Sequence, residues 1–101
     1  MLIAKFLSPR ATKRDLIFLS TPSLWTLYPF LPVVRRAARG GCQQLGVVYD
    51  AAGASGLYGY SATVFLGNFF ALPKTEAELL ALPRCVYDTL DELVSDGWVV
   101  D

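Results

Sequence analysis

An apolar tract runs from residue 31 to residue 70 and contains a single acidic side chain, Asp50. Apolar and polar positions alternate with period two in parts of this tract, and β-branched and aromatic residues are frequent, which is typical of strands. The pattern predicts three strands, at 31–38, 43–50 and 60–70. Both faces of the third strand are largely apolar, which predicts a strand that is covered on both sides.

Gly40 and Gly41 lie between the first two predicted strands. Both glycines adopt positive φ angles readily, so the pair predicts a two-residue hairpin turn. A turn this tight places Val34 opposite Val47, and a longer loop would shift that pairing slightly. The three strands then form an antiparallel meander.

The last third of the chain changes to helical period and predicts two short helices, at 76–82 and 89–96. Each has a threonine followed three residues later by a glutamate, the pattern of a capping box: Thr75 with Glu78, and Thr89 with Glu92. Gly97 stands where a left-handed helix end is expected. Trp98 then follows in a position to pack on Leu93.

Four other segments have weaker patterns. The apolar run 15–20 is compatible with a strand, and Thr21-Pro22 predicts the start of a short helix. The small residues of 51–59 predict a flexible loop, and residues 98–101 are short and strand-like.

These elements predict a single α+β domain over residues 1–101. Its expected architecture is a small antiparallel three-stranded β-meander with short C-terminal helices packed on one face. The N-terminal segment, a second copy of the chain, or both would cover the other face.

Composition adds a surplus of apolar surface to this picture. Hydrophobic residues make up 53% of the chain and charged residues only 18%, below the usual quarter. A domain of this size hides a limited share of its surface, so part of the surplus is expected on an exposed patch or partner interface. A membrane-spanning helix over 16–34 is disfavoured by Pro22, Pro29 and Pro32, which interrupt that uncharged stretch.

Charge is balanced overall and uneven along the chain. Residues 1–50 hold seven basic and two acidic side chains, and residues 51–101 hold two basic and seven acidic ones. In one domain the halves are expected to neutralise each other. The alternative is a dipolar surface that pairs with a second copy, as a homodimer.

The chain has no histidine and two cysteines, Cys42 and Cys85. This excludes Cys/His zinc sites and the Ser/His/Asp and Cys/His catalytic groups. The sequence shows no recognisable group of catalytic residues, cofactor-binding motif or metal site, so we expect that the protein is not an enzyme. Two lone thiols without a secretion signal indicate the cytoplasm.

Three groups of side chains are candidates for interaction. Arg35, Arg36 and Arg39 form the one basic cluster of note, but no aromatics interleave with them, so nucleic acid is a disfavoured partner. The other two groups are aromatic: Trp25, Tyr28 and Phe30 between prolines, and Tyr58 and Tyr60 at the rim of the 51–59 loop.

The sequence therefore favours a non-catalytic protein-interaction or assembly module, whose partner is another protein or a second copy. The alternative is a small-molecule or nucleic-acid binding domain that uses the 51–59 loop or the Arg35–Arg39 hairpin.

Overall fold

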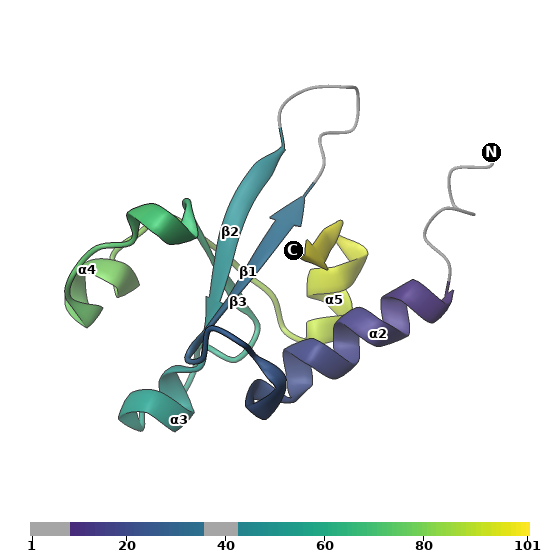
Figure 1. The fold of residues 1–101 in the computed structure, drawn as a ribbon, viewed down its shortest axis with the longest axis horizontal. Coiled ribbons are helices and arrows are strands. Elements are labelled where there is room, and N and C mark those ends of the chain that lie inside the picture. The colour runs from purple at the N-terminus through teal and green to yellow at the C-terminus, as the bar shows by residue number, and fades with distance from the viewer. Residues whose placement is uncertain (1–8, 36–42) are drawn as a thin grey trace.

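The computed structural model describes residues 9–35 and 43–101, which form one antiparallel sheet with helices on both faces (Figure 1). The strands are β1 (Phe30–Arg35), β2 (Gln44–Tyr49), β3 (Thr63–Leu66), β4 (Arg84–Val86) and β5 (Trp98–Val100). The helices are α2 (Pro9–Ser20), α3 (Ala51–Ser55), α4 (Glu76–Leu80) and α5 (Leu90–Ser95), with 3-10 turns η1 (Pro22–Leu24) and η2 (Phe69–Ala71).

The strand order is β4-β3-β2-β1-β5. The first four strands form a meander, and β5 returns to pair with β1 at the opposite edge. The α+β class is therefore confirmed, whereas the prediction of a three-stranded meander was wrong. The two extra strands have three residues each, too few for period two to be recognised, although residues 98–101 were predicted to be strand-like.

The pairing of β1 with β2 differs from the tight-turn prediction by two residues. Val34 lies opposite Leu45, and Val47 lies opposite Pro32. A shift of two leaves every side chain on its original face, because side chains alternate with period two. The predicted Gly40-Gly41 turn lies outside the described residues.

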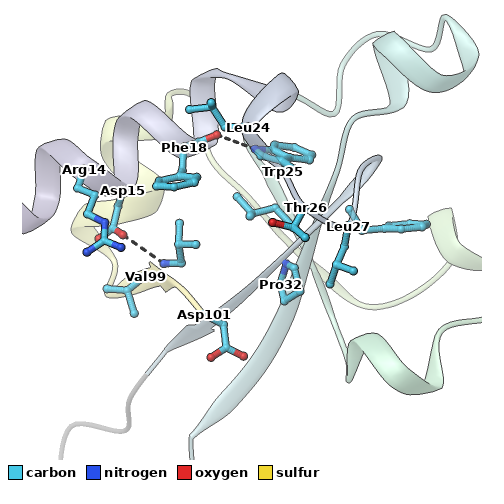
Figure 2. Close-up of a pocket in the computed structure, with 13 residues that line it drawn as sticks. Arg14, Asp15, Phe18, Leu24, Trp25, Thr26, Leu27, Pro32, Val99 and Asp101 are labelled. Carbon is cyan, nitrogen blue, oxygen red and sulfur yellow. Dashed lines mark hydrogen bonds between the residues drawn. The ribbon is translucent and has the colours of Figure 1, made fainter.

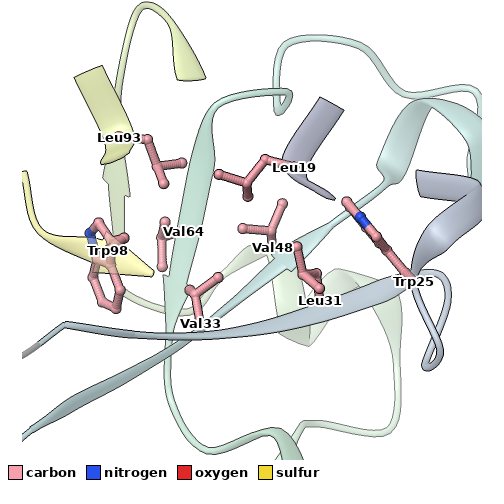
Figure 3. Close-up of a cluster of buried hydrophobic side chains, with 8 residues drawn as sticks. All are labelled: Leu19, Trp25, Leu31, Val33, Val48, Val64, Leu93 and Trp98. Atoms are coloured by element: carbon pink, nitrogen blue, oxygen red, sulfur yellow. The ribbon is translucent and has the colours of Figure 1, made fainter. Parts of the chain in front are cut away.

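One face of the sheet carries the larger core, which α2 and α5 cover (Figure 1). Its buried members come from four strands, two helices and one turn: Leu19, Trp25, Leu31, Val33, Val48, Val64, Leu93 and Trp98. Leu93 and Trp98 lie together at one end of this cluster, and Trp25 lies at the other (Figure 3). We call this side of the sheet face one.

The opposite side, face two, carries a second core of Tyr49, Ala51, Phe65 and Leu79. Leu79 belongs to α4, so the prediction that both C-terminal helices cover one face was wrong. The two helices lie on different faces because the edge strand β4 comes between them in the sequence, and the chain crosses from face two to face one along this strand. Strand β3 is buried on both sides, as predicted, since Val64 and Phe65 are fully buried.

Local signals placed the helix ends correctly. The Thr75 hydroxyl accepts a hydrogen bond from the Glu78 backbone N–H at 3.2 Å, and Thr89 does the same for Glu92 at 3.2 Å. Gly97 ends α5 with φ of +101°. Both threonine caps and the positive φ at Gly97 are thus confirmed, whereas the glutamates bond other groups than the backbone N–H of the capping threonine: Glu78 accepts from the Thr75 hydroxyl and Glu92 from the Asp88 backbone N–H.

Two segments differ from their predicted local structure. The run 15–20 belongs to α2 and is not a strand; its buried Leu19 packs into the face-one core, and this packing selects the helix. Residues 51–55 form α3 and not a loop, because the Asp50 side chain accepts from the Gly53 backbone N–H and caps a run rich in alanine. Within the described residues, no helix combines the length and apolarity needed to cross a bilayer.

Candidate interaction surface

The three aromatic side chains between η1 and the start of β1 differ in their burial and their contacts. Trp25 is only 5% exposed and its indole Nε1 donates to the Phe18 carbonyl at 2.6 Å, so it belongs to the core. Tyr28 is exposed and its hydroxyl donates to the Asp50 carboxylate at 2.9 Å. Phe30 begins β1 and points to face two, so it lies apart from Trp25 and Tyr28, whose ring centroids are 6.3 Å apart.

A chain of ring contacts leads from Phe30 to the surface. Phe30 stacks on buried Tyr49 with ring centroids 5.3 Å apart, and meets the edge of Phe69 at 5.9 Å. Phe69 in turn contacts Phe70 at 5.3 Å. The Asn68 side chain accepts from the Phe70 backbone N–H at 2.9 Å and so fixes the start of η2. On this capped turn 90% of the Phe70 surface is exposed.

An apolar groove of about 470 Å³ lies beside Phe70 on face two. Leu27, Pro32 and Leu45 line it together with the two phenylalanines of η2. Leu27 and Leu45 are 43% and 40% exposed. The sequence placed Phe69 and Phe70 in the predicted strand 60–70, whereas β3 ends at Leu66 and Asn68 starts a local turn; Leu45 was not singled out.

A second hollow, of about 660 Å³, lies between α2, the 24–27 turn, the start of β1 and the end of β5 (Figure 2). We call it the edge hollow. It shares Leu27, Pro32 and Asp101 with the apolar groove, so the two depressions meet beside the start of β1. At the other end of the edge hollow the Asp15 carboxylate accepts from the Val100 backbone N–H at 3.3 Å (Figure 2).

Of the three arginines in the predicted basic cluster, the structure describes only Arg35. Arg35 is half-buried and fully engaged: it forms an ion pair with Asp96 at 2.6 Å, donates to Gln44 at 2.5 Å, and has its Cζ 4.7 Å from the Trp98 ring centroid. Arg36 and Arg39 lie outside the described residues. The Arg35–Asp96 pair joins the basic half of the chain to the acidic half.

Asp96 also binds a second partner, Tyr87. The Tyr87 hydroxyl donates to Asp96 and accepts from the Trp98 indole Nε1 at 3.0 Å. Burial and the bond to Asp96 raise the pKa of Tyr87 to about 12. These groups satisfy one another, which makes the network a brace between β1, α5 and β5.

The 51–59 loop places its two tyrosines differently. Tyr58 is 83% exposed, whereas Tyr60 is half-buried with its ring centroid 6.2 Å from that of Phe65. A hollow of about 360 Å³ lies between this segment, Trp25 and Leu90. It shares no lining residue with the apolar groove.

A polar cluster ties this segment to α4. The Tyr49 and Ser55 hydroxyls both donate to the Glu76 carboxylate. These two hydrogen bonds hold the pKa of Glu76 below its usual range. Burial, and then the bond to Glu76, raise the pKa of Tyr49. The three groups pair with each other and clamp α3 and β2 to α4.

Among residues 9–35 and 43–101, no three Cys, Asp or Glu side chains gather in a way that could hold a metal ion. No family model, curated protein or solved structure matches this chain. Exposed apolar side chains, among them Leu27, Leu45 and Phe70, lie around β1.

Proposed function

We propose that this protein is a non-catalytic protein-interaction module that docks its partner in the apolar groove beside Phe70. The observation that carries the proposal is Phe70 itself, which is 90% exposed, lies on a turn whose backbone Asn68 caps, and has its ring against that of Phe69. Aromatic side chains on rigid supports are enriched among the residues that dominate binding energy at protein interfaces.

The neighbours of Phe70 support the same conclusion. Leu27 and Leu45 are partly exposed on the walls of the groove, and Leu24 adds apolar surface in the adjoining edge hollow. Contiguous apolar surface on a small domain is typical of an interaction site. The walls are provided by strands and a capped turn, so the partner would meet a preformed shape.

The polar groups support a non-catalytic role. Within the described chain, every buried side-chain nitrogen or oxygen has a hydrogen-bond partner. The two polar clusters, around Glu76 and around Asp96, use their groups to join elements of the fold. The cytoplasm stays the predicted compartment, on the grounds of the two thiols.

The second candidate function is small-molecule binding in the 360 Å³ hollow at the 51–59 loop. Its volume lies in the range of ligand pockets, and exposed Tyr58 stands at its edge. Nucleic-acid binding through the Arg35–Arg39 hairpin has less support, because Arg35 is already paired with Asp96.

Photo-crosslinking in the cells that produce the protein tests the proposal. A benzophenone amino acid replaces Phe70 in one variant and Tyr58 in a matched control, since both are exposed aromatic positions. We expect a discrete protein adduct from position 70 and none from position 58. Leu45→Glu, which puts a charge on the groove wall, should remove the adduct.

Adducts from position 58 alone, or an adduct from position 70 that survives Leu45→Glu, would contradict docking in the groove. An adduct of twice the chain's mass would identify the partner as a second copy.

A further inference from the structure

Helix α2 has an exposed face that carries positive charge. Lys13 and Arg14 are exposed, and Ile17, which follows them by four and three residues, is 57% exposed. This spacing puts the three side chains on one side of the helix, opposite the buried Leu19. A third base of α2, Arg10, precedes Lys13 by three residues. We call the side formed by Lys13, Arg14 and Ile17 the outer face of α2.

The bases of this face are not neutralised within the molecule. All nine acidic residues of the chain belong to its described part, and none of them forms an ion pair with Lys13 or Arg14. Asp15, the acidic residue of α2, is turned toward β5, where it accepts from the Val100 backbone N–H at 3.3 Å. The positive charge of the outer face is therefore available to a partner.

The position of α2 makes this face accessible to an extended surface. The first turns of the helix extend beyond the sheet and beyond α5 (Figure 1). Helix α2 packs on face one, where it contacts α5 and β5, whereas the apolar groove beside Phe70 lies on face two. A partner that binds the outer face of α2 therefore leaves the apolar groove open.

An anionic partner complements the charge of this face, and its exposed isoleucine favours a lipid surface over nucleic acid. Helices that lie in a bilayer interface place apolar side chains at the acyl boundary and Lys and Arg beside the headgroups. Nucleic acid is bound by basic side chains together with aromatic rings or hydrogen-bonding groups, and Ile17 is neither. The sequence before the helix has the same composition. Residues 1–8 contain Lys5, no acidic residue and five large apolar ones: Met1, Leu2, Ile3, Phe6 and Leu7.

We infer that the outer face of α2 binds the surface of a lipid bilayer that contains anionic lipids. Lys13 and Arg14 contact the headgroups, and Ile17 enters the boundary with the acyl chains. The helix lies on the bilayer and does not cross it. Anionic lipids give the cytoplasmic leaflet its negative surface potential, which agrees with the predicted compartment. The protein then presents its apolar groove to a partner at the membrane.

Co-sedimentation of the full chain with vesicles tests the inference. Vesicles of phosphatidylcholine with about 30% phosphatidylserine should bind the protein, and vesicles of phosphatidylcholine alone should bind it at least about tenfold more weakly, because they carry no net charge. Raising the NaCl concentration from about 0.05 M to about 0.5 M should release the protein, since salt screens exposed charges.

Two substitutions of exposed lysines form a matched pair, since Lys13 lies on the outer face of α2 and Lys74 lies before α4. We expect Lys13→Gln to weaken vesicle binding by about fivefold and Lys74→Gln by less than about twofold, because only a base near the anionic surface contributes. Ile17→Ala should also weaken binding by about fivefold and leave the salt dependence unchanged, because it removes an apolar contact. All three positions are exposed, so the urea midpoint should stay unchanged.

Four results would overturn the inference: no vesicle binding at the lower salt concentration, equal binding to both kinds of vesicle, equal effects of Lys13→Gln and Lys74→Gln, or no effect of Ile17→Ala. Binding to a DNA duplex in place of vesicles would identify nucleic acid as the anionic partner and would overturn it as well.

Discussion

Trp98 is the side chain on which most local interactions of face one converge. It is fully buried, its Nε1 donates to the Tyr87 hydroxyl at 3.0 Å, and Arg35 lies over its ring at 4.7 Å. Gly46 on β2 makes room for the ring: a Cβ there would lie 3.0 Å from Trp98 and 2.4 Å from Val64. A large ring at an edge strand is thus accommodated by the absence of a side chain two strands away.

The glycine before this tryptophan provides the first prediction. Gly97 has φ of +101°, a conformation that side chains with Cβ disfavour. We expect Gly97→Ala to lower the free energy of unfolding by about 1 kcal/mol, measured by urea denaturation. Ser95→Ala, an exposed change in the same helix, is the control and should shift it by less than about 0.5 kcal/mol. Equal effects of the two changes would contradict strain at Gly97.

At the scale of elements, α4 and α5 are too short to be stable alone. They have five and six residues, whereas isolated helices need more than twice that length. Each is held by a threonine cap at its start and by one buried leucine, Leu79 in α4 and Leu93 in α5. Helix α4 has a further tether, the hydrogen bonds of Glu76 to Tyr49 and Ser55.

This tether predicts a pH dependence. The pKa of Glu76 is lower in the folded chain than in the unfolded chain, so its contribution to stability is complete above the unfolded pKa, near 4.5. The contribution is lost as the pH falls below that value and through the folded pKa. We therefore expect the stability difference between the wild type and Glu76→Gln to shrink between about pH 7 and pH 3 in urea denaturation.

The same comparison in a Tyr49→Phe background is the control. Removing one of the two donors brings the pKa of Glu76 closer to its unfolded value, so the pH dependence should become weaker. An unchanged pH dependence would show that Tyr49 does not contribute to the low pKa of Glu76.

At the scale of the whole molecule, two phenylalanines that are close in the sequence differ in their exposure to solvent. Phe65 is fully buried in the face-two core, and Phe70 is 90% exposed beside the apolar groove. Strand β3 ends between them, and the Asn68 cap turns the chain away from the sheet. The surplus of apolar residues is therefore divided between a core on each face and an exposed surface around β1.

This division predicts a contrast between two identical substitutions. We expect Phe65→Ala to cost about 3–5 kcal/mol of unfolding free energy, because it removes a fully buried ring. Phe70→Ala should change it by less than about 0.5 kcal/mol. A large loss on Phe70→Ala would mean that the residue serves the fold of the single chain and is not a docking residue.

The sequence by itself determined the features that depend on near neighbours in the chain. The capping threonines, the helix end at Gly97 and the centres of the first two strands follow from local hydrogen bonding, backbone conformation and period two. Among the candidate side chains, Tyr28 and Tyr58 are exposed whereas Trp25 is buried, and the groove residue Leu45 was not among the candidates that the sequence offered.

Tertiary structure decided the features that depend on distant contacts. Whether 15–20 became a helix, which face α4 and α5 covered, and whether Trp25 was core or surface all depended on packing partners far along the chain. The sequence predicted that the basic first half would be neutralised by the acidic second half, but only the fold decided that Arg35 pairs with Asp96, 61 positions away. Burial depends on which surfaces meet in three dimensions, whereas local patterns report only the residues within a few positions of each other.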